Sequence, residues 1–364
     1  MERLEVQLGE RSYPIWIGPG AVQQLPDHLH EAGIGTNRKL FMITDENVAP
    51  LHLDDVQGIL KRAGYQVVTA VVPGGERAKS LDIYGEMMTK VLEAGLDRKS
   101  AILALGGGVV GDLTGFVAAT YMRGVDFIQI PTTLLAHDSS VGGKVAVNHP
   151  LAKNIIGAFH QPKLVCYDTN FLKTLPPREL AAGFAEMIKH GLIWDEQFVG
   201  WLEEHADALW NLDDSLLQEA LYRACSVKVA VVSQDERENG IRAILNLGHT
   251  FGHSFESLLH YETLNHGEGV AIGMVGAALL AEKAGLAQDI SNRTIGLLKK
   301  YHLPTSLQMD LSIDGMVGVM HHDKKGESGQ LVFIVPRKIG EVEIRKDIDE
   351  NLVREVLSKL KEGE

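Results

Sequence analysis

The stretch that decides the fold is residues 101–153, AILALGGGVVGDLTGFVAATYMRGVDFIQIPTTLLAHDSSVGGKVAVNHPLAK. It opens with a short apolar run, Ala101 to Leu105, which is typical of a strand covered on both faces. Three glycines at 106–108 follow, and we expect a helix to begin near Val109. A strand, a glycine turn and a helix in this order direct backbone N–H groups and the positive end of a helix dipole at any anion above the strand end.

Gly106, Gly108 and Gly111 also match the G-x-G-x-x-G fingerprint of dinucleotide binding. No clear acidic partner for a ribose closes the next strand about 20 residues further on, so the fingerprint alone is weak. Two interpretations therefore stay open at this point. The turn binds an anion, or it only packs the strand tightly against the helix.

Strand and helix patterns alternate through the first half of the chain. A strand pair is expected at residues 4–8 and 13–17, further strands at 39–44, 66–72, 101–105 and 127–130, and helices around 56–63 and 81–94. Such alternation implies a Rossmann-like α/β domain with a parallel sheet and helices on its faces. Ligands of these sheets bind outside the carboxyl ends of the strands.

The loops after the expected strands have polar or glycine-rich tips. They carry Asp45, Glu46 and Asn47, then Gly74, Gly75, Glu76 and Lys79, then the triple glycine, then Thr132 and Thr133. Because parallel strands end at the same edge of a sheet, these four loops come together. They indicate a crevice of the size of a nucleotide.

A length of 364 residues with 45% hydrophobic content exceeds what one core usually holds, so two domains are expected. Two prolines in KTLPP, residues 173–177, end a strand-like segment and open a long helical pattern. We place the boundary there. Residues 1–175 then form the α/β domain, and residues 176–364 form a mainly helical domain with one short hairpin at 331–335 and 342–344.

The composition limits the partners and the compartment. A net charge of −13 disfavours nucleic acid or an anionic membrane as the main partner, although it allows a local basic pocket. Cys166 and Cys225 form no C-x-x-C motif, which fits a reducing compartment and excludes a disulfide scaffold. The first 18 residues lack the apolar core of a signal peptide, and the longest apolar run, 270–281, is too short to span a membrane. A cytoplasmic location is the expectation.

Residues typical of metal sites gather in the second domain. Glu186 and Lys189 lie about one helical turn apart in AEMIKHG, His249 and His253 are four residues apart in LNLGHTFGHSFE, and His266 follows in NHGEGVAIG. One carboxylate with two imidazoles is a usual catalytic Zn²⁺ set that leaves positions open for substrate oxygens. Histidines at this spacing also cap or pack helices, so both interpretations stay open from the spacing alone.

Three charged residues have plain structural interpretations as well. Lys189 and Lys228 fit solvated lysines on helices, and Asp138 fits the cap of a turn. Their residue types and positions do not decide between these interpretations and a place in a site.

Eight motifs together resemble the 3-dehydroquinate synthase family, and the resemblance covers essentially the whole chain. They are GGGVVGD (106–112), MRG (122–124), PTTLLAHDSSVGGK (131–144), KNIIGAF (153–159), AEMIKHG (185–191), SVKVAVV (226–232), RAILNLGHTFGH (242–253) and HGEGVAIGM (266–274). Jointly they are far more specific than the glycine fingerprint. No position that the family uses chemically departs from its pattern.

The resemblance implies an NAD-binding α/β domain, a helical metal domain and an active site in the cleft between them. The implied metal ligands are Glu186, His249 and His266, with Zn²⁺ usual and Co²⁺ possible. The implied NAD contacts are Asp45, Asn47, Gly74, Gly75, Glu76, Lys79, Gly107, Gly108, Val109, Asp112, Thr132, Thr133, Lys144, Lys153, Phe171 and Thr174. The implied substrate contacts are Asp138, Lys144, Asn154, Lys189, Lys228, Arg242, Asn246 and His253, with Arg123, Lys153 and one of Lys324 and Lys325 at a phosphate.

The family's reaction, in the shikimate pathway, converts 3-deoxy-D-arabino-heptulosonate 7-phosphate to 3-dehydroquinate and phosphate. NAD takes a hydride from a metal-bound hydroxyl, phosphate leaves by β-elimination, the hydride returns, and an intramolecular aldol step closes the carbocycle. The resemblance implies catalytic roles for His253, Lys189, Lys144, Asp138 and Asn246. His253 is the expected group for proton transfer at the oxidised hydroxyl, and the substrate phosphate can serve as the base for its own elimination.

Three other functions stay open. A sister sugar phosphate cyclase would keep nearly every motif. A metal- and NAD-dependent polyol dehydrogenase would need no phosphate-binding cluster of Arg123, Lys144 and Lys153. A non-catalytic nucleotide-binding module would need no open metal site. The expected partner is a small sugar acid phosphate, with no nucleic acid and no membrane, and the expected assembly is a homodimer.

Overall fold

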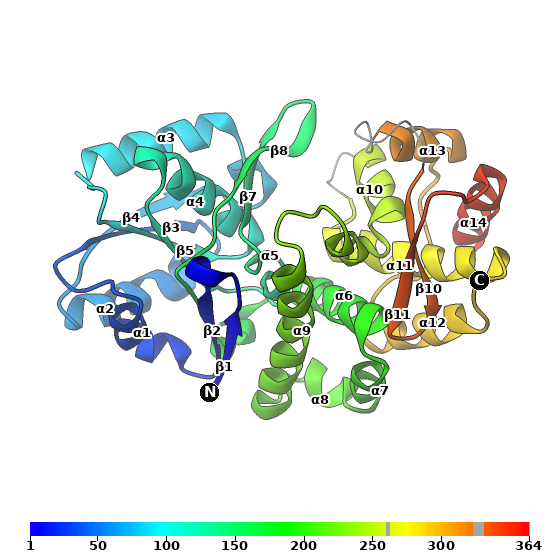
Figure 1. Ribbon diagram of the computed structural model, residues 1–364, viewed down its shortest axis with the longest axis horizontal. Helices are drawn as coiled ribbons and strands as arrows, with labels where there is room; N and C mark the ends of the chain where they lie inside the picture. Colours follow the sequence, from blue (N-terminus) through cyan, green and yellow to red (C-terminus); the bar gives the residue numbers. More distant parts are fainter. Residues whose placement is uncertain (260–262, 323–330, 364) are drawn as a thin grey trace. The chain divides into compact units, whose positions relative to one another are not determined.

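The computed structural model describes residues 1–259, 263–322 and 331–363 (Figure 1). Contacts between Cα atoms divide the chain into two compact units. The first holds Met1–Pro176 and Leu217–Arg237, and the second holds Pro177–Leu216 and Glu238–Glu364. The long helix α9 (Asp214–Gln234) thus packs mainly with the first unit, although the segments on either side of it belong to the second. The domain boundary expected between residues 175 and 176 stays a prediction. These units differ from it at residue 176 and in residues 217–237.

The first unit is built on a seven-stranded sheet in the order β1-β2-β9-β6-β5-β3-β4. The strands are β1 (Glu2–Val6), β2 (Tyr13–Gly18), β3 (Lys39–Asp45), β4 (Gln66–Val72), β5 (Ala101–Gly106), β6 (Asp126–Pro131) and β9 (Leu164–Asp168). β1 pairs antiparallel with β2, and the other neighbours pair parallel. The predicted Rossmann-like parallel sheet is confirmed.

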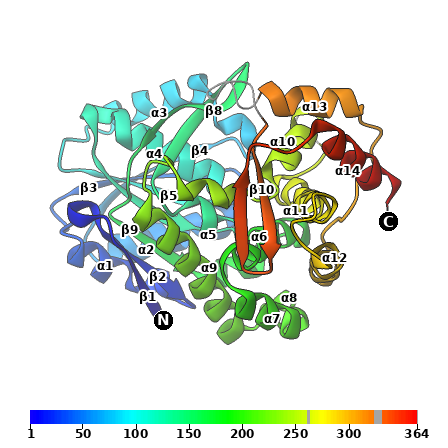
Figure 2. The ribbon, with the colours of Figure 1, turned by 45° about the vertical axis from the view of Figure 1, so that its right-hand side comes forward.

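Helices cover both faces of this sheet, as Figures 1 and 2 show. They are α1 (Leu25–Glu31), α2 (Asp54–Arg62), α3 (Leu81–Glu93) and α4 (Gly108–Thr120), with the short α5 (Ala136–Ser139) after β6. Successive strand residues point to opposite faces. Leu40 and Met42 of β3 accordingly pack with α1 and α2, whereas Phe41 and Ile43 pack with α3 and α4. Continuous apolar runs were therefore the correct signal for these central strands.

A hairpin of β7 (Lys144–His149) and β8 (Ala152–Phe159) was missing from the predicted elements. Its first strand packs against α4, but β8 lies outside it and is largely exposed. Only Ile156 and Ala158 of this strand pack against the core, whereas Ile155 is exposed, so the sequence shows no clear apolar alternation. The tertiary pairing with β7, rather than local pattern, defines β8.

The second unit is mainly helical, as predicted. Its helices are α6 (Pro177–Trp194), α7 (Glu196–Glu204), α8 (Ala206–Trp210), α10 (His249–Leu258), α11 (His266–Lys283), α12 (Ile290–Lys300), α13 (Ile313–His322) and α14 (Glu350–Glu362), and its hairpin is β10 (Phe333–Lys338) with β11 (Glu341–Arg345). His205 separates α7 from α8. Within the described part of the chain, no helix has both the length and the apolar character needed to cross a membrane.

Glycines let α10 and α11 approach closely, and this approach positions the first residue of each helix. A Cβ atom added at Gly252 would lie 2.8 Å from the carbonyl oxygen of Gly269, and one added at Gly273 would overlap the carbonyl oxygen of Gly248. The backbones therefore touch where any other residue would separate them. His249 opens α10 beside this contact.

We predict that Gly273→Ala lowers the free energy of unfolding by about 1–3 kcal/mol, because the added methyl group forces two backbones apart. Gly296→Ala is the matched control, since its Cβ would meet no atom within 4 Å on the exposed face of α12. That change should raise stability by about 0.5–1 kcal/mol through helix propensity. Denaturant midpoints of the two variants measure both effects, and equal midpoints would contradict the packing argument.

Candidate active site and metal centre

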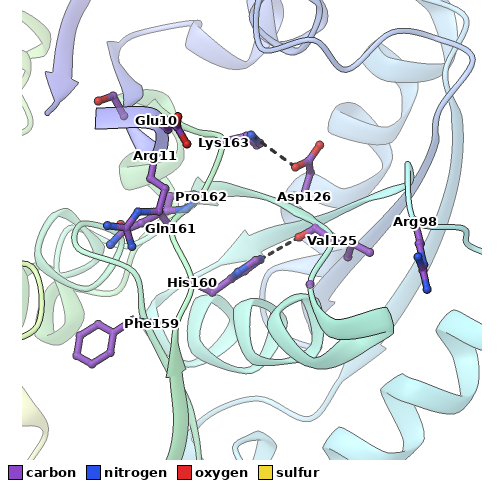
Figure 3. Close-up of a pocket in the computed structure, with 12 residues that line it drawn as sticks. Glu10, Arg11, Arg98, Val125, Asp126, Phe159, His160, Gln161, Pro162 and Lys163 are labelled. Atoms are coloured by element: carbon purple, nitrogen blue, oxygen red, sulfur yellow. Dashed lines mark hydrogen bonds and ion pairs between the residues drawn. The ribbon is translucent and has the colours of Figure 1, made fainter. Parts of the chain in front are cut away.

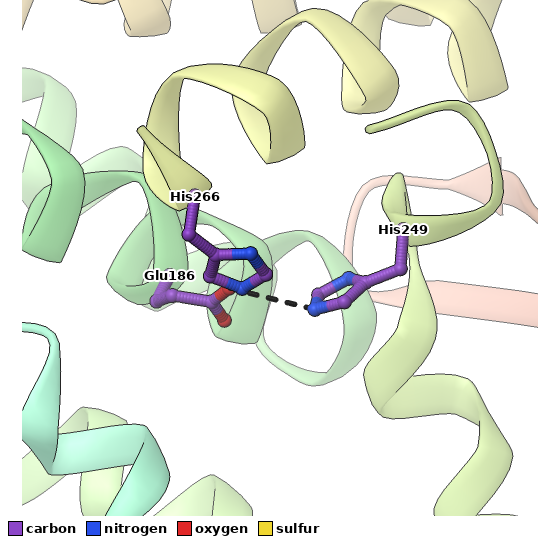
Figure 4. Close-up of side chains that lie close together, drawn as sticks. All are labelled: Glu186, His249 and His266. Atoms are coloured by element: carbon purple, nitrogen blue, oxygen red, sulfur yellow. Dashed lines mark ion pairs between the residues drawn. The ribbon is translucent and has the colours of Figure 1, made fainter. Parts of the chain in front are cut away.

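Three potential ligands converge in the second unit, each from a different helix (Figure 4). Glu186 lies in the middle of α6, while His249 and His266 are the first residues of α10 and α11. The Nε2 atoms of His249 and His266 lie 3.7 Å and 3.4 Å from Oε1 of Glu186. The ligand atoms of all three residues lie within 4.8 Å of one another.

The other ring nitrogen of each histidine has a hydrogen-bond acceptor. Nδ1 of His249 lies 3.2 Å from the carbonyl oxygen of Leu247, and Nδ1 of His266 lies 3.1 Å from Oε1 of Glu256. With the proton on Nδ1 in both rings, each Nε2 lone pair is directed to the side of Glu186. This is the arrangement by which proteins orient histidine ligands of a metal.

The two imidazoles differ in their proton affinity. Burial, together with the nearby Lys189 ammonium, holds the pKa of His249 well below its ordinary value. Burial acts in the same direction on His266, but hydrogen bonds to Glu186 and Glu256 outweigh it and raise the pKa of His266 to about 10. Binding of a metal ion at Nε2 would therefore require His266 to give up a proton, whereas His249 already favours the neutral form.

A buried ion pair borders this cluster. Nζ of Lys189 lies 2.5 Å from Oε2 of Glu186, and both side chains are 1% exposed. His253 lies beside the two histidines, with its ring centroid 5.2 Å from that of His249 and 6.0 Å from that of His266. The structure therefore brings His253 and Lys189 to the predicted ligand set. One carboxylate and two imidazoles in this geometry fit a Zn²⁺ or Co²⁺ ion.

Two further predicted residues precede α10, in the 3-10 helix Ile241–Asn246. Arg242 is 2% exposed, and Asn246 donates from Nδ2 to Oε1 of Glu238 at 3.0 Å. Lys324 and Lys325 lie outside the described residues. The role of Glu256 beside His266 was not predicted from the sequence. The signal was nevertheless present, because Glu256 follows His253 by three residues in HTFGHSFE (249–256) and so lies on the same face of the helix.

The carboxyl edge of the sheet in the first unit gathers the predicted charged residues. Nζ of Lys79 lies 2.6 Å from Oδ2 of Asp112 and also contacts Oδ1 of Asn154. Lys153, the residue before Asn154, lies 3.5 Å from Oε1 of Glu76. These residues come from the loop after β4, from α4 and from β8. The structure thus joins predicted cofactor and substrate contacts in one cluster.

The glycine turn after β5 is required by packing. A Cβ atom at Gly107 would lie 2.8 Å from the Thr133 side chain, and one at Gly108 would lie 2.9 Å from Oγ of Ser139. The N–H of Thr132 donates to the carbonyl of Gly106 at 3.0 Å. The structural interpretation of the turn is therefore sufficient by itself to explain its glycines. The same turn starts α4 at the strand ends, where an anion would meet free N–H groups.

The remaining predicted cofactor residues lie in loops that follow the strands at this edge. Asp45 accepts from the N–H of Asn47 at 2.8 Å, which fixes the turn after β3. Thr174 Oγ1 donates to the carbonyl of Phe171 at 2.8 Å and lies 2.9 Å from Nε2 of His52. Because the hydroxyl has one proton, His52 must donate from Nε2. The ring of His52 also contacts Phe171, with centroids 4.4 Å apart.

Lys228 belongs to the first unit through α9. Its Nζ lies 2.9 Å from Oδ2 of Asp138 and also donates to the Asp138 carbonyl. The interpretation of Lys228 as a solvated lysine is wrong, since it is only 6% exposed. Lys144, by contrast, is exposed at the start of β7.

Arg123 lies apart from these residues, at the opposite edge of the sheet. It follows α4, which starts with Gly108 at the carboxyl ends of the strands and whose 13 residues span about 20 Å. Met122, Arg123 and Gly124 adopt positive φ angles of 49°, 69° and 117°. The first unit therefore does not bring Arg123 to Lys153.

A surface pocket of about 330 Å³ occupies the same edge of the sheet as Arg123 (Figure 3). Several of its charged side chains are already paired, Asp126 with Arg38 and Lys163, and Arg11 with Glu236. None of the described residues assigned to a site lines it. We do not assign the chemistry to this pocket.

Similar proteins support an assignment to one family. A model of the 3-dehydroquinate synthase N-terminal region matches residues 69–182, and a model of the C-terminal region matches residues 183–326. A 3-dehydroquinate synthase of Desulforamulus reducens is 50% identical over 360 residues, which are 98% of this chain and 100% of that protein.

Two solved structures share the fold over the full length. A 2-epi-5-epi-valiolone synthase from Streptomyces hygroscopicus subsp. jinggangensis, with NAD⁺ and Zn²⁺ bound, has a TM-score of 0.89 at 27% identity and covers 98% of this chain and 99% of that one. A 2-deoxy-scyllo-inosose synthase complexed with carbaglucose-6-phosphate, NAD⁺ and Co²⁺ has a TM-score of 0.88 at 26% identity and covers 100% of both chains. The chain is 50% identical to the Desulforamulus reducens 3-dehydroquinate synthase but only 27% and 26% identical to these two synthases. Together with the two matching family models, this identity shows that the chain belongs to the 3-dehydroquinate synthase family.

Proposed function

We propose that the chain converts 3-deoxy-D-arabino-heptulosonate 7-phosphate to 3-dehydroquinate and phosphate. The observation that carries this proposal is the convergence of Glu186, His249 and His266 in a protein that is 50% identical to a 3-dehydroquinate synthase over 98% of its length. A helical unit with a metal-type cluster and a Rossmann-like unit with charged strand ends supply the two kinds of group that the reaction needs.

We propose Glu186, His249 and His266 as ligands of Zn²⁺ or Co²⁺, which when bound supplies a Lewis acid that lowers the pKa of the substrate hydroxyl. NAD, held by the strand-end loops of the first unit, supplies the hydride acceptor. Lys189, in its ion pair with Glu186, adds positive charge beside the oxygen that becomes a ketone. His253, next to both histidine ligands, is the proposed proton acceptor.

The anionic ends of the substrate need cationic partners in this acidic protein. We propose that Lys153 and Asn154 hold the phosphate side and that Arg242, with Asn246, holds the carboxylate side. We propose that the ion pair of the buried Lys228 with the partly buried Asp138 orients polar groups of the substrate. Positioning of this kind lets the phosphate remove a proton from its own substrate molecule, so that elimination needs no separate base.

Parallel measurement of phosphate and NADH in one cuvette tests the proposed function. If the hydride is returned, phosphate accumulates to many equivalents per enzyme, while NADH absorbance shows no matching rise. A polyol dehydrogenase gives one NADH per substrate and no phosphate, which would overturn the proposal. NMR of the product distinguishes 3-dehydroquinate from the product of a sister sugar phosphate cyclase.

We predict that Glu256→Gln weakens Zn²⁺ binding by about 10-fold or more, because the charge that supports His266 is lost while the shape is kept. Glu186→Gln should have a larger effect, since an amide is a poorer ligand than a carboxylate. Glu268→Gln is the control, because Glu268 lies in the first turn of the same helix, two residues after His266, and pairs with Arg178. Competition with a chelating indicator measures the affinities. Equal affinity in the Glu256 and Glu268 variants would contradict the role of Glu256.

We further propose that the chain acts as a homodimer and that Arg123 contacts the phosphate bound by the partner. Lys153 binds Glu76 at the carboxyl edge of the sheet, whereas Arg123 lies about 20 Å away at the far end of α4. No arginine side chain spans that distance. If both residues contact one phosphate, they must come from different copies of the chain.

Mixing two inactive variants tests this arrangement. Arg123→Ala and Lys153→Ala should each reduce kcat/KM strongly, because each removes a phosphate contact. In a mixed dimer one site regains both residues, so random exchange should restore about a quarter of wild-type activity. Size-exclusion chromatography verifies the dimer. No recovery in mixtures that demonstrably contain mixed dimers would show that Arg123 does not act across the interface.

A further inference from the structure

Asn148, near the end of β7, makes three hydrogen bonds to two other segments of the first unit. Its backbone N–H donates to the carbonyl oxygen of Lys79 at 2.7 Å. Its Nδ2 donates to Oε1 of Glu76 at 2.8 Å, and its Oδ1 accepts from the N–H of Asn154 at 2.9 Å. One side chain thus joins the loop after β4 to the start of β8.

Only a side-chain amide of this length fits these contacts. The site requires a donor toward the Glu76 carboxylate and an acceptor toward the Asn154 N–H at the same time. Aspartate has the same shape but offers no donor when ionised, and alanine offers neither group. The identity of Asn148 is therefore set by its two partners and not by the strand that carries it.

The contact with Asn154 supports a backbone that is unfavourable by itself. Asn154 has a φ angle of 53°, in the left-handed region, which asparagine tolerates better than most residues other than glycine but which is still less favourable than the usual regions. Such conformations persist where the surroundings fix them, and they concentrate at functional sites. Here Oδ1 of Asn148 accepts a hydrogen bond from the N–H of Asn154. In this conformation the side chain of Asn154 reaches Nζ of Lys79.

The contact with Glu76 supports a charge. Burial tends to raise the pKa of Glu76, but Lys79, Lys153 and the Asn148 amide together hold it below the ordinary value. Lys79 is itself paired with Asp112 of α4 at 2.6 Å. The groups that face Glu76 from the loop, from β7 and from β8 are therefore Lys79, Asn148 and Lys153, with Asp112 behind the first lysine.

We propose that Asn148 is a positioning residue that holds the cofactor residues Glu76 and Lys79 and the substrate residue Asn154 in one arrangement. The proposal rests on the proposed function, because the roles of those three residues do. Asn148 touches the groups that bind, and it acts through them. Loss of Asn148 should therefore change the affinity for NAD and the KM for the substrate together. A residue that contacted only the cofactor or only the substrate would change one of the two quantities.

The test compares Asn148→Ala, Asn148→Asp and Leu151→Ala in the full-length protein. Leu151 is the control, since it is 89% exposed at the tip of the same hairpin. NAD affinity is measured by titration over a pH series, and kcat and KM are measured for the heptulosonate phosphate. Thermal melts verify that each variant is folded. The aspartate variant creates no cavity, so it keeps the test valid if the alanine variant is unstable.

We expect Asn148→Ala to weaken NAD binding roughly 10-fold, as loss of one or two hydrogen bonds does, and to raise the substrate KM. Without the amide donor the pKa of Glu76 rises, so Glu76 becomes protonated earlier as the pH is lowered. NAD affinity should therefore begin to fall at a higher pH than in the unaltered protein when the solution is acidified. Asn148→Asp should move this loss of affinity to a still higher pH, because it places a second negative charge beside Glu76. Leu151→Ala should leave both quantities unchanged.

Two negative results have different meanings. If the unaltered protein binds NAD and both Asn148 variants match it in affinity and pH profile, the positioning role is wrong and the proposed function stands. If the unaltered protein binds no NAD, the proposed function itself is overturned, and the inference with it.

Discussion

The buried carboxylate of Glu186 is the constraint on which the second unit depends. The carboxylate of Glu186 is 1% exposed, and removing such a group from water costs several kcal/mol. Charged and polar partners must offset this cost. Lys189, one helical turn away, supplies one partner, and the two imidazoles supply polar contacts from α10 and α11. Those helices reach Glu186 because glycines allow their backbones to touch. The packing of small residues and the charge in the centre are thus parts of one arrangement.

Much of the fold follows from local pattern. The buried strands β3, β5 and β6 are continuous apolar runs, and each is followed by a loop with polar or glycine residues, so both the sheet and its ligand edge were predictable. The ligand set was visible only as an open alternative, because spacing along a helix cannot show that Glu186 and His266 meet. The resemblance to a family supplied that contact, and the geometry agrees with it.

The parts that the sequence did not predict depend on tertiary contacts. β8 was missed because its outer face is exposed, and Asn148 because its importance lies in its contacts with Glu76 and Asn154 rather than in any motif. The place of Arg123 was missed for another reason. A motif gives a residue's identity, but only the direction of α4 shows that Arg123 lies at the far edge of the sheet.

The charged residues of the first unit lead to a conclusion about selectivity. Lys79 pairs with Asp112, Lys153 with Glu76 and Lys228 with Asp138, in a protein of net charge −13. An anion that uses these lysines must share or replace a protein carboxylate, and a partly buried carboxylate that loses its partner also loses free energy. The free energy gained on binding is therefore the difference between two ion pairs of the same ammonium group, one with the bound anion and one with the protein carboxylate.

Long-range attraction contributes little to this difference, because the net negative charge of the protein repels anions. Geometry contributes most, since the existing pairs already hold the lysine side chains in place and less entropy is lost on binding. A site of this kind accepts an anion whose oxygens match the positions of the ammonium groups and discriminates against polyanions in general, which suits the recognition of one sugar acid phosphate.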